Sequence, residues 1–162
     1  MNPYLQAIHN GLGYWRQQAG DLGDAAVAAL DRDRFNLHQL LEEGLRLEAT
    51  QLPTAELMVR LGHFIETRGY WEEWLPLLER AIAVCAAAPT LQARLLNSQG
   101  YFLAEKRGRY EEGVAVLQAA RQTAQTADDQ RLLAESLFYL GEIQRLMHRY
   151  DAASRYAHEA LA

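Results

Sequence analysis

The residues of this chain most able to do chemistry are five histidines, one cysteine and three pairs of adjacent glutamates. A zinc or hydrolytic site needs such side chains at a fixed helical spacing, as in H-E-x-x-H. His38 and Glu42 are one helical turn apart, but this pair is more typical of a solvated surface contact. No partner at metal-ligand spacing exists for the others, which are His9, His63, His148 and His158. We therefore predict no metal site.

The cysteine and the glutamate pairs also lack the pattern of an active site. Cys85 lies in the stretch AIAVCAAAPT, which is typical of a small core residue near a helix end. The chain contains neither the phosphate-binding pattern G-x-x-x-x-G-K-[ST] nor a nucleophile elbow. The glutamate pairs fall at helix surfaces or in first turns, where the helix dipole favours them; they are Glu42-Glu43, Glu72-Glu73 and Glu111-Glu112. The sequence predicts no catalytic residue and no cofactor.

Composition restricts the class of protein and of partner. With 162 residues, 49% of them hydrophobic and only four prolines, the chain can form one mostly helical domain with a packed core. Its net charge of −5 argues against a nucleic-acid or anionic-membrane surface, which needs a concentrated excess of Lys and Arg. A single cysteine, no leader after Met1 and no run of about 18 apolar residues predict a cytoplasmic protein that does not span a membrane.

Three segments of the chain can be aligned with one another. They begin at Ala55 (AELMVRLGHFIETRGYWEEWLPLLERAIA), Ala93 (ARLLNSQGYFLAEKRGRYEEGVAVLQAARQ) and Ala134 (AESLFYLGEIQRLMHRYDAASRYAHEALA). Each has a first helix with a glycine, a tight break, an aromatic residue and a second helix that ends near a small residue. The glycines are separated by 38 and then 41 residues. The sequence predicts helix–turn–helix repeats over about 55–88, 93–126 and 134–162.

The repeated residues predict how the two helices of each pair pack. A glycine inside a helix costs roughly 1 kcal/mol relative to alanine, so we expect it to face the second helix at close range. Between Gly100 and Gly108 the middle segment is one residue longer, so its first helix or its turn must absorb an insertion. The residues assigned to packing are Gly62, Trp71, Trp74, Ala81, Gly100, Gly108, Tyr110, Ala120, Gly141, Tyr150, Ala153 and Ala160.

Three residues depart from the repeated pattern. Trp74 stands where a small residue is expected; we interpret it as filling a wider gap toward the preceding helices, the alternative being an exposed anchor for a partner. Pro76 follows within the second helix, near enough to its start to cost little. His148 stands at the turn glycine, where histidine tolerates a left-handed backbone better than most residues.

This pattern resembles the tetratricopeptide repeat, whose consensus has the same order of glycine, turn, aromatic and small residues. The resemblance implies an all-α fold, a right-handed superhelix of antiparallel helix pairs, whose concave side holds protein or peptide segments. The groove-facing positions of that family correspond to Glu56, Val59, His63, Glu66, Arg94, Asn97, Tyr101, Ala104, Glu135, Phe138, Glu142 and Arg145.

Nine of these residues are candidates for partner binding, namely Val59, His63, Glu66, Arg94, Asn97, Tyr101, Phe138, Glu142 and Arg145. Tyr101 and Phe138 would supply apolar anchors. Asn97 and Arg145 would fix a backbone or a carboxylate. For any one of them, a solvated helix face is the alternative. The clamp that captures chaperone C-termini is excluded, because Val59 and Phe138 stand where that clamp uses lysine.

Residues 1–54 are expected to form two or three helices that pack on the repeats. PYLQAIHNGLGYWRQQAG is the first, stopped by Gly20-Asp21, and DAAVAALDRDRFNLHQLLEEGLRLEA is the second, long or bent at Asp31 to Arg34. It should end before Leu52-Pro53, and Thr54 should cap the first repeat helix.

Part of this region resembles the repeat portion of bacterial signal-transduction ATPases of the NB-ARC or STAND type. The resemblance covers residues 22–84 and is carried by LDRDRFNLHQLLEEGL and by LGHFIETRGYWEEWLPLLERA. It implies a sensor or regulatory region of a larger signalling protein.

The sequence thus predicts a non-catalytic module that binds a protein or peptide segment. A homo-oligomerisation or scaffold module is the alternative. It is motivated by the last helix pair, which has no polar cap and should expose Leu161 and Tyr156, an edge suited to a homodimer.

Overall fold

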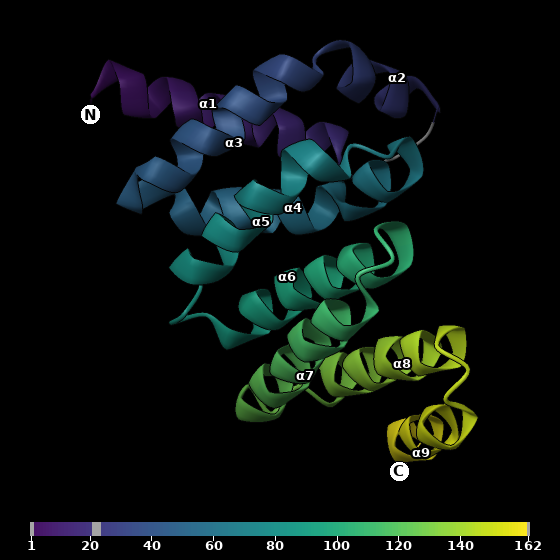
Figure 1. The fold of residues 1–162 in the computed structure, drawn as a ribbon. Helices are drawn as coiled ribbons and strands as arrows, with labels where there is room; N and C mark the ends of the chain where they lie inside the picture. Colours follow the sequence, from purple (N-terminus) through teal and green to yellow (C-terminus); the bar gives the residue numbers. More distant parts are fainter. Residues whose placement is uncertain (1, 21–23, 162) are drawn as a thin grey trace. The chain divides into compact units, whose positions relative to one another are not determined.

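Helices are the only regular elements in the described part of the chain. The computed structural model describes residues 2–20 and 24–161. Gly20 follows the end of the first helix, as predicted, and Asp21 lies outside the described residues. The predicted all-α class is confirmed, whereas the right-handed superhelix stays a prediction. The elements of Figure 1 are α1 (Pro3–Gln18), α2 (Asp24–Arg32), α3 (Arg34–Arg46), α4 (Glu48–Arg68), α5 (Trp71–Val84), α6 (Pro89–Tyr101), η1 (Phe102–Lys106), α7 (Tyr110–Thr126), α8 (Gln130–Leu146) and α9 (Tyr150–Ala160).

The chain divides into two compact units, Met1–Cys85 and Ala86–Ala162, and each is described by itself. The first unit contains α1 to α5, and the second contains η1 and α6 to α9. The boundary predicted after residue 54 lies inside α4 rather than between two helices. The division into an N-terminal part and three repeats stays a prediction.

α4 begins earlier than the sequence suggested. Its first residue is Glu48, and the chain bends at Leu47, which is extended with φ −96° and ψ 116°. The Thr50 hydroxyl closes this bend, because it lies 2.8 Å from the carbonyl oxygen of Gly44 and 3.0 Å from that of Leu47. The predicted cap at Thr54 is therefore wrong. Its hydroxyl donates to the Thr50 carbonyl within the helix, at 2.7 Å.

In the first unit, α3 packs on both α4 and α5, and α1 packs on α3 and α4. Trp74 of α5 is fully buried, and its ring lies edge-on to His38 of α3, with centroids 6.4 Å apart. It fills the space toward the preceding helices and is not exposed to a partner. Pro76 is exposed, and α5 continues through it to Val84.

The bend predicted between Asp31 and Arg34 is present, because Asp33 alone separates α2 from α3. The Asp31 carboxylate accepts a hydrogen bond from the Tyr70 hydroxyl (2.9 Å) and lies 2.8 Å from the Arg68 guanidinium. These contacts join the end of α2 to the turn after α4.

In the second unit, the first helix changes from an α-helix to a π-helix, η1, between Phe102 and Lys106. A π-helix bonds residue i to residue i+5, so it accommodates one residue more than the equivalent α-helical turn. The insertion predicted between Gly100 and Gly108 is therefore absorbed by the helix. The turn that follows is tight, since the Gly108 N–H donates to the Ala104 carbonyl at 3.1 Å.

The three predicted breaks share one backbone conformation. Gly69, Gly108 and His148 have positive φ angles of 77°, 64° and 57°. A left-handed residue after a helix lets the last carbonyls find hydrogen-bond donors. Glycine adopts this conformation without steric cost and histidine tolerates it, so the three turns follow from local chemistry.

Helices α6 and α7 approach closely where two glycines face each other. A Cβ added at Gly100 would lie 3.0 Å from the Gly113 carbonyl oxygen, and one added at Gly113 would lie 2.5 Å from the Ala104 Cβ. Neither position accepts a side chain unless the helices move apart. In the next pair, a Cβ at Gly141 would lie 3.5 Å from the Ala153 carbonyl oxygen, which is an ordinary contact.

The other residues assigned to packing differ in burial. Trp74, Ala81 and Ala120 are fully buried, and Gly62, Trp71, Tyr110, Ala153 and Ala160 are partly buried. Tyr150 departs from the prediction because it is 62% exposed. Its counterpart Tyr110 is partly buried against the cluster of Ala104, Leu117, Leu140 and Ile143, to which α8 contributes two residues.

Candidate functional site

The candidate partner-binding residues do not share one environment. Three of them lie on α4 in the first unit and are exposed or partly buried: Val59, His63 and Glu66. The others lie in the second unit, where Arg94, Phe138 and Arg145 are exposed, Tyr101 and Glu142 are partly buried and Asn97 is buried. Of the further groove-facing positions, Glu56 is exposed, Glu135 is partly buried and Ala104 is buried.

Asn97 lies inside the contact between α6 and α8 and is only 1% exposed. Its Oδ1 accepts a hydrogen bond from the Ser136 hydroxyl at 2.8 Å, and that hydroxyl also lies 3.0 Å from the Leu132 carbonyl oxygen. Its Nδ2 is buried without a hydrogen-bond partner among the described residues. Asn97 is therefore not available to a partner's backbone, and instead it helps to fix the register of two helices.

Tyr101 lies at the junction of α6 and η1, next to a charged pair. Its ring is tilted against Tyr139 of α8, with centroids 5.3 Å apart. The Lys106 ammonium lies 5.3 Å from the Tyr101 ring centroid and 2.9 Å from the Glu105 carboxylate. A cation at this distance from an aromatic face is attracted to it, so Tyr101 and the charged pair hold one another in place.

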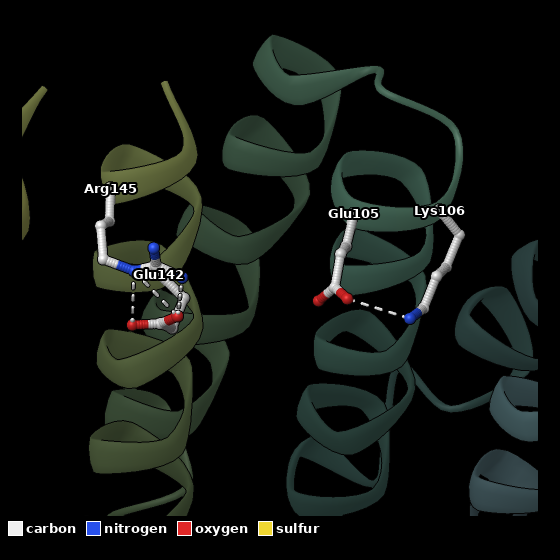
Figure 2. A network of polar contacts seen from close by, with 4 residues as sticks. All are labelled: Glu105, Lys106, Glu142 and Arg145. Carbon is white, nitrogen blue, oxygen red and sulfur yellow. Dashed lines mark hydrogen bonds and ion pairs between the residues drawn. The ribbon is translucent and has the colours of Figure 1, made fainter. Parts of the chain in front are cut away.

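Figure 2 shows this pair, Glu105–Lys106, together with a second pair on α8, Glu142–Arg145. The Arg145 guanidinium approaches the Glu142 carboxylate at 2.8 Å through Nη2 and at 3.2 Å through Nε. Hydrogen bonding and the charge of Glu142 raise the pKa of Arg145. Burial opposes ionisation of Glu105, but hydrogen bonds from Tyr101 and Lys106 outweigh it and lower its pKa. Each of the two pairs joins one acidic and one basic side chain.

An open groove runs between α8 and α9. Its volume is about 430 Å³, and most of its surface is apolar. Two large apolar side chains in it are exposed, Phe138 by 59% and Leu161 by 88%. The complete lining is Leu137, Phe138, Gly141, Glu142, Arg145, Ala153, Ser154, Ala157, Ala160 and Leu161.

Four residues singled out in the sequence lie on this groove, although the sequence predicted a different surface, formed by the first helices of all three repeats. Phe138, Glu142 and Arg145 were candidates for the concave surface and Leu161 for the exposed edge, and the structure brings these four together. Tyr156, also expected at the exposed edge, is partly buried. Its hydroxyl accepts a hydrogen bond from Gln118 at 2.6 Å, and its ring packs beside the buried cluster of α7 and α8.

The residues missed were Ser154 and Ala157 of α9, which line the groove together with Ala153 and Ala160. The sequence had assigned Ala153 and Ala160 to packing within the helix pair and not to a binding surface. The available signal was the recurrence of small side chains every three or four residues in AASRYAHEALA, which places them on one helix face.

The side chains able to act as nucleophiles or metal ligands do not form a site. Cys85 is fully buried in the first unit, and burial raises its pKa to about 11. Its thiol is therefore protonated at neutral pH and weakly nucleophilic. Among the described residues, no three or more His, Cys, Asp or Glu side chains are grouped so that they could hold a metal ion.

One finding bears on membranes. In residues 2–20 and 24–161, no helix combines the length and apolar character needed to cross a bilayer.

The chain was compared with protein-family models, with curated proteins and with solved structures, and none of these comparisons gives a match.

Proposed function

We propose that this chain is a non-catalytic helical-repeat module of the tetratricopeptide type that binds protein segments. The observation that carries this proposal is the open apolar groove between α8 and α9, with Phe138 and Leu161 exposed at its sides. Exposed apolar surface rimmed by charged groups is typical of protein-interaction sites. The net charge of −5 favours a protein partner over a nucleic acid.

The repeat character is supported by contacts that recur at one spacing. Several hydrogen bonds between separate segments join residues 38 or 39 apart in the two units, a spacing close to that of the sequence repeat, whereas the contact of His38 with the Glu73 carbonyl spans 35. They connect Tyr70 to Asp31, Arg80 to Glu42, Asn97 to Ser136, Gln118 to Tyr156 and Arg149 to Glu111. We infer from this regularity, and from the resemblance to NB-ARC or STAND-type ATPases, that the module is a regulatory arm of a cytoplasmic signalling protein.

Affinity capture tests the proposal. The tagged chain serves as bait in a cytosolic extract, beside a variant with Phe138→Ala and Arg145→Ala, and retained proteins are identified by mass spectrometry. The matched control carries Gln125→Ala and Arg131→Ala, which are exposed positions of α7 and α8 outside the groove. Proteins retained by the wild type and by the control, but lost by the groove variant, are the expected result. Equal capture by all three baits would contradict the proposal.

Homo-oligomerisation is the second candidate function, and the 88% exposure of Leu161 favours it. It predicts a mass that rises with protein concentration in sedimentation velocity and falls back to the monomer in Leu161→Ser. A monomer at all concentrations would remove this candidate and leave the first.

A further inference from the structure

The first helix of the second unit has one residue more than its counterparts in the other repeats. From the repeated glycine to the turn, the first and third repeats read GHFIETRG and GEIQRLMH, whereas the second reads GYFLAEKRG. Without Ala104 the second becomes GYFLEKRG, which matches the first repeat at its phenylalanine, glutamate, arginine and both glycines, with leucine in place of isoleucine. The comparison identifies Ala104 as the inserted residue, and it lies at the middle of η1.

The burial of the two helices follows the same alignment. Ala104 is fully buried and packs in the core cluster to which α7 and α8 contribute. Without a gap in the alignment, it would correspond to Arg145 of α8, which is exposed. With Ala104 set aside, the exposed Glu105 corresponds to Arg145, and every residue from the glycine to this position has the same burial in both helices.

Helix α7 makes room for the extra residue at Gly113. A Cβ added there would lie 2.5 Å from the Ala104 Cβ, 2.7 Å from the Gly100 carbonyl oxygen and 3.0 Å from the Ala104 nitrogen. The same position of the other two repeats, three residues after the aromatic, holds Trp74 and Ala153. The repeat with the inserted residue has a glycine here, and the Ala104 methyl group occupies space that a side chain would need.

The wide turn also returns two charged residues to the outer side of the helix. A π-helix bonds residue i to residue i+5, and the Lys106 ammonium lies 5.3 Å from the ring centroid of Tyr101, five residues earlier. Figure 2 shows Glu105 and Lys106 on η1 and Arg145 on α8. Burial raises the pKa of Glu105, but hydrogen bonds from Tyr101 and Lys106 and the charge of Arg145 lower it below its usual value. Glu105 therefore lies within reach of the Arg145 charge.

We propose that η1 and Gly113 form one device that keeps the register of the first helix. Ala104 lies in the wide turn, Gly113 admits it, and Glu105 thereby takes the position near Arg145 that Ala104 would otherwise hold. Glu105, and not Ala104, is then the second repeat's member of the row that the sequence predicted to face a groove. This inference goes beyond the proposed function, because it assigns a role to the inserted residue whether or not a partner binds.

Deletion of Ala104 tests the proposal, alone and together with Gly113→Ala. In the wild-type background, Gly113→Ala should lower the urea midpoint of unfolding, because the new Cβ meets the Ala104 methyl group. In the deletion background the same substitution should leave the midpoint unchanged or raise it. The pair α6–α7 then has the composition of α8–α9, where Gly141 faces Ala153 at an ordinary contact distance.

A matched control deletes Gln144 of α8, a buried residue in a helix that has no inserted residue. A deletion within an α-helix turns the residues that follow by about 100°. Deletion of Gln144 should therefore lower the urea midpoint much more than deletion of Ala104, or abolish cooperative unfolding. Circular dichroism measures the helix content and the midpoint of each variant.

A cross-linking measurement reports the register independently of stability. In a Cys85→Ala background, Glu105→Cys and Arg145→Cys place two thiols at the same repeat position. A short bismaleimide should join them with and without Ala104, which mass spectrometry detects. The pair Ala104→Cys and Arg145→Cys should not be joined, because position 104 is buried.

Three outcomes would overturn the inference. Loss of the cross-link at position 105 on deletion of Ala104 would mean that another residue is the inserted one. Additive effects of the deletion and Gly113→Ala would mean that Gly113 does not accommodate Ala104. Loss of cooperative unfolding in both deletion variants, with and without Gly113→Ala, would also contradict it, because a residue that only fills the wide turn must be dispensable.

Discussion

The two helix pairs of the second unit, α6–α7 and α8–α9, follow one sequence pattern. They differ in how closely the two helices approach each other and in whether a third helix packs on the pair. In the pair α6–α7, Gly100 faces Gly113, and a Cβ on Gly113 would lie only 2.7 Å from the Gly100 carbonyl oxygen. In the pair α8–α9, Gly141 faces Ala153 at a distance that a Cβ could occupy. The first pair is covered by α8, and the second borders an open groove.

This difference shows that a glycine at the repeated position does not by itself bring two helices together. The close approach requires a second glycine on the facing helix, because each Cβ would otherwise meet the opposite backbone. In α8–α9 the position of that second glycine is occupied by Ala153, and the two helices keep an ordinary separation. The repeated glycine therefore has a packing role at Gly100 that it lacks at Gly141.

The strongest test of this contrast is alanine substitution at the two positions. Gly100→Ala should lower the free energy of unfolding by about 1–3 kcal/mol, because a Cβ there would lie 2.6 Å from Leu117 Cγ and 3.0 Å from the Gly113 carbonyl oxygen, and this overpacking exceeds the gain in helix propensity. Gly141→Ala should be neutral or raise it by up to about 1 kcal/mol, since a methyl group fits there and alanine favours the helix. Urea denaturation of the two variants and the wild type measures both. Equal destabilisation by both changes would contradict the contrast.

The buried thiol of Cys85 lies in the first unit, outside both helix pairs, and it makes the free energy of unfolding depend on pH. Its pKa is raised to about 11, so the unfolded thiol ionises at a lower pH than the folded one. The free energy of unfolding should not depend on this thiol below its pKa in the unfolded chain, about 8.5. As pH rises from there toward 11, the free energy of unfolding should fall by on the order of 2 kcal/mol. Denaturation of the wild type and Cys85→Ala at pH 7 and pH 10.5 measures this slope.

The matched variant should lose less stability between these two pH values, because it has no thiol to ionise. The same thiol should resist alkylation at pH 8 in the native chain and react after unfolding. Rapid alkylation of native Cys85 would contradict its burial. Groove variants such as Phe138→Ala should leave the alkylation rate unchanged.

Asn97 is buried and Phe138, at the same position of the next repeat, is exposed. Substitutions at these two residues should change the free energy of unfolding by a smaller amount. A double-mutant cycle with Asn97→Ala and Ser136→Ala should show a coupling energy of about 0.5–1.5 kcal/mol, the usual range for a hydrogen bond. Phe138→Ala should change the free energy of unfolding by no more than about 0.5 kcal/mol, because its side chain is 59% exposed. A coupling near zero would mean that the Asn97–Ser136 contact does not hold the register of α6 and α8.

The smallest effect is expected from the ion pair that joins α7 to α9. Glu111 and Arg149 are 69% and 51% exposed, and such surface pairs contribute about 0–1 kcal/mol. Glu111→Gln should therefore lower the melting temperature only slightly at low salt and not at all in 1 M NaCl, where charges are screened. A large loss that persists at high salt would show that Glu111 supports the pair by packing rather than by charge.

Much of the local structure could be predicted from the sequence. The turns at Gly69, Gly108 and His148 follow from residues that accept a left-handed backbone, and the bend near Asp33 was also predicted correctly. The extra residue before Gly108 predicted an insertion, and η1 accommodates it. The cap at Thr54 was wrong because Thr50 makes the competing hydrogen bonds to α3. Sequence alone does not show which of two threonines reaches a preceding helix.

The candidate site was predicted less well than the fold. Asn97, Phe138 and Arg145 were assigned to one surface because all three stand at groove-facing positions of the repeat pattern, yet the first is buried and the other two are exposed. Ser154 and Ala157 of α9 were missed because small side chains carry little chemistry of their own, and only their helical spacing marks them as one face.

What the sequence by itself determined was the all-α class, the turn positions and the extra residue in the second unit. These depend on backbone preferences that act over a few residues, so they can be read along the chain. Tertiary structure decided which glycine closes a helix pair, which side of α8 is buried and where a groove remains open. Those features depend on residues 38 or 39 positions apart, as between Asn97 and Ser136, and no local preference fixes which side chain lies there.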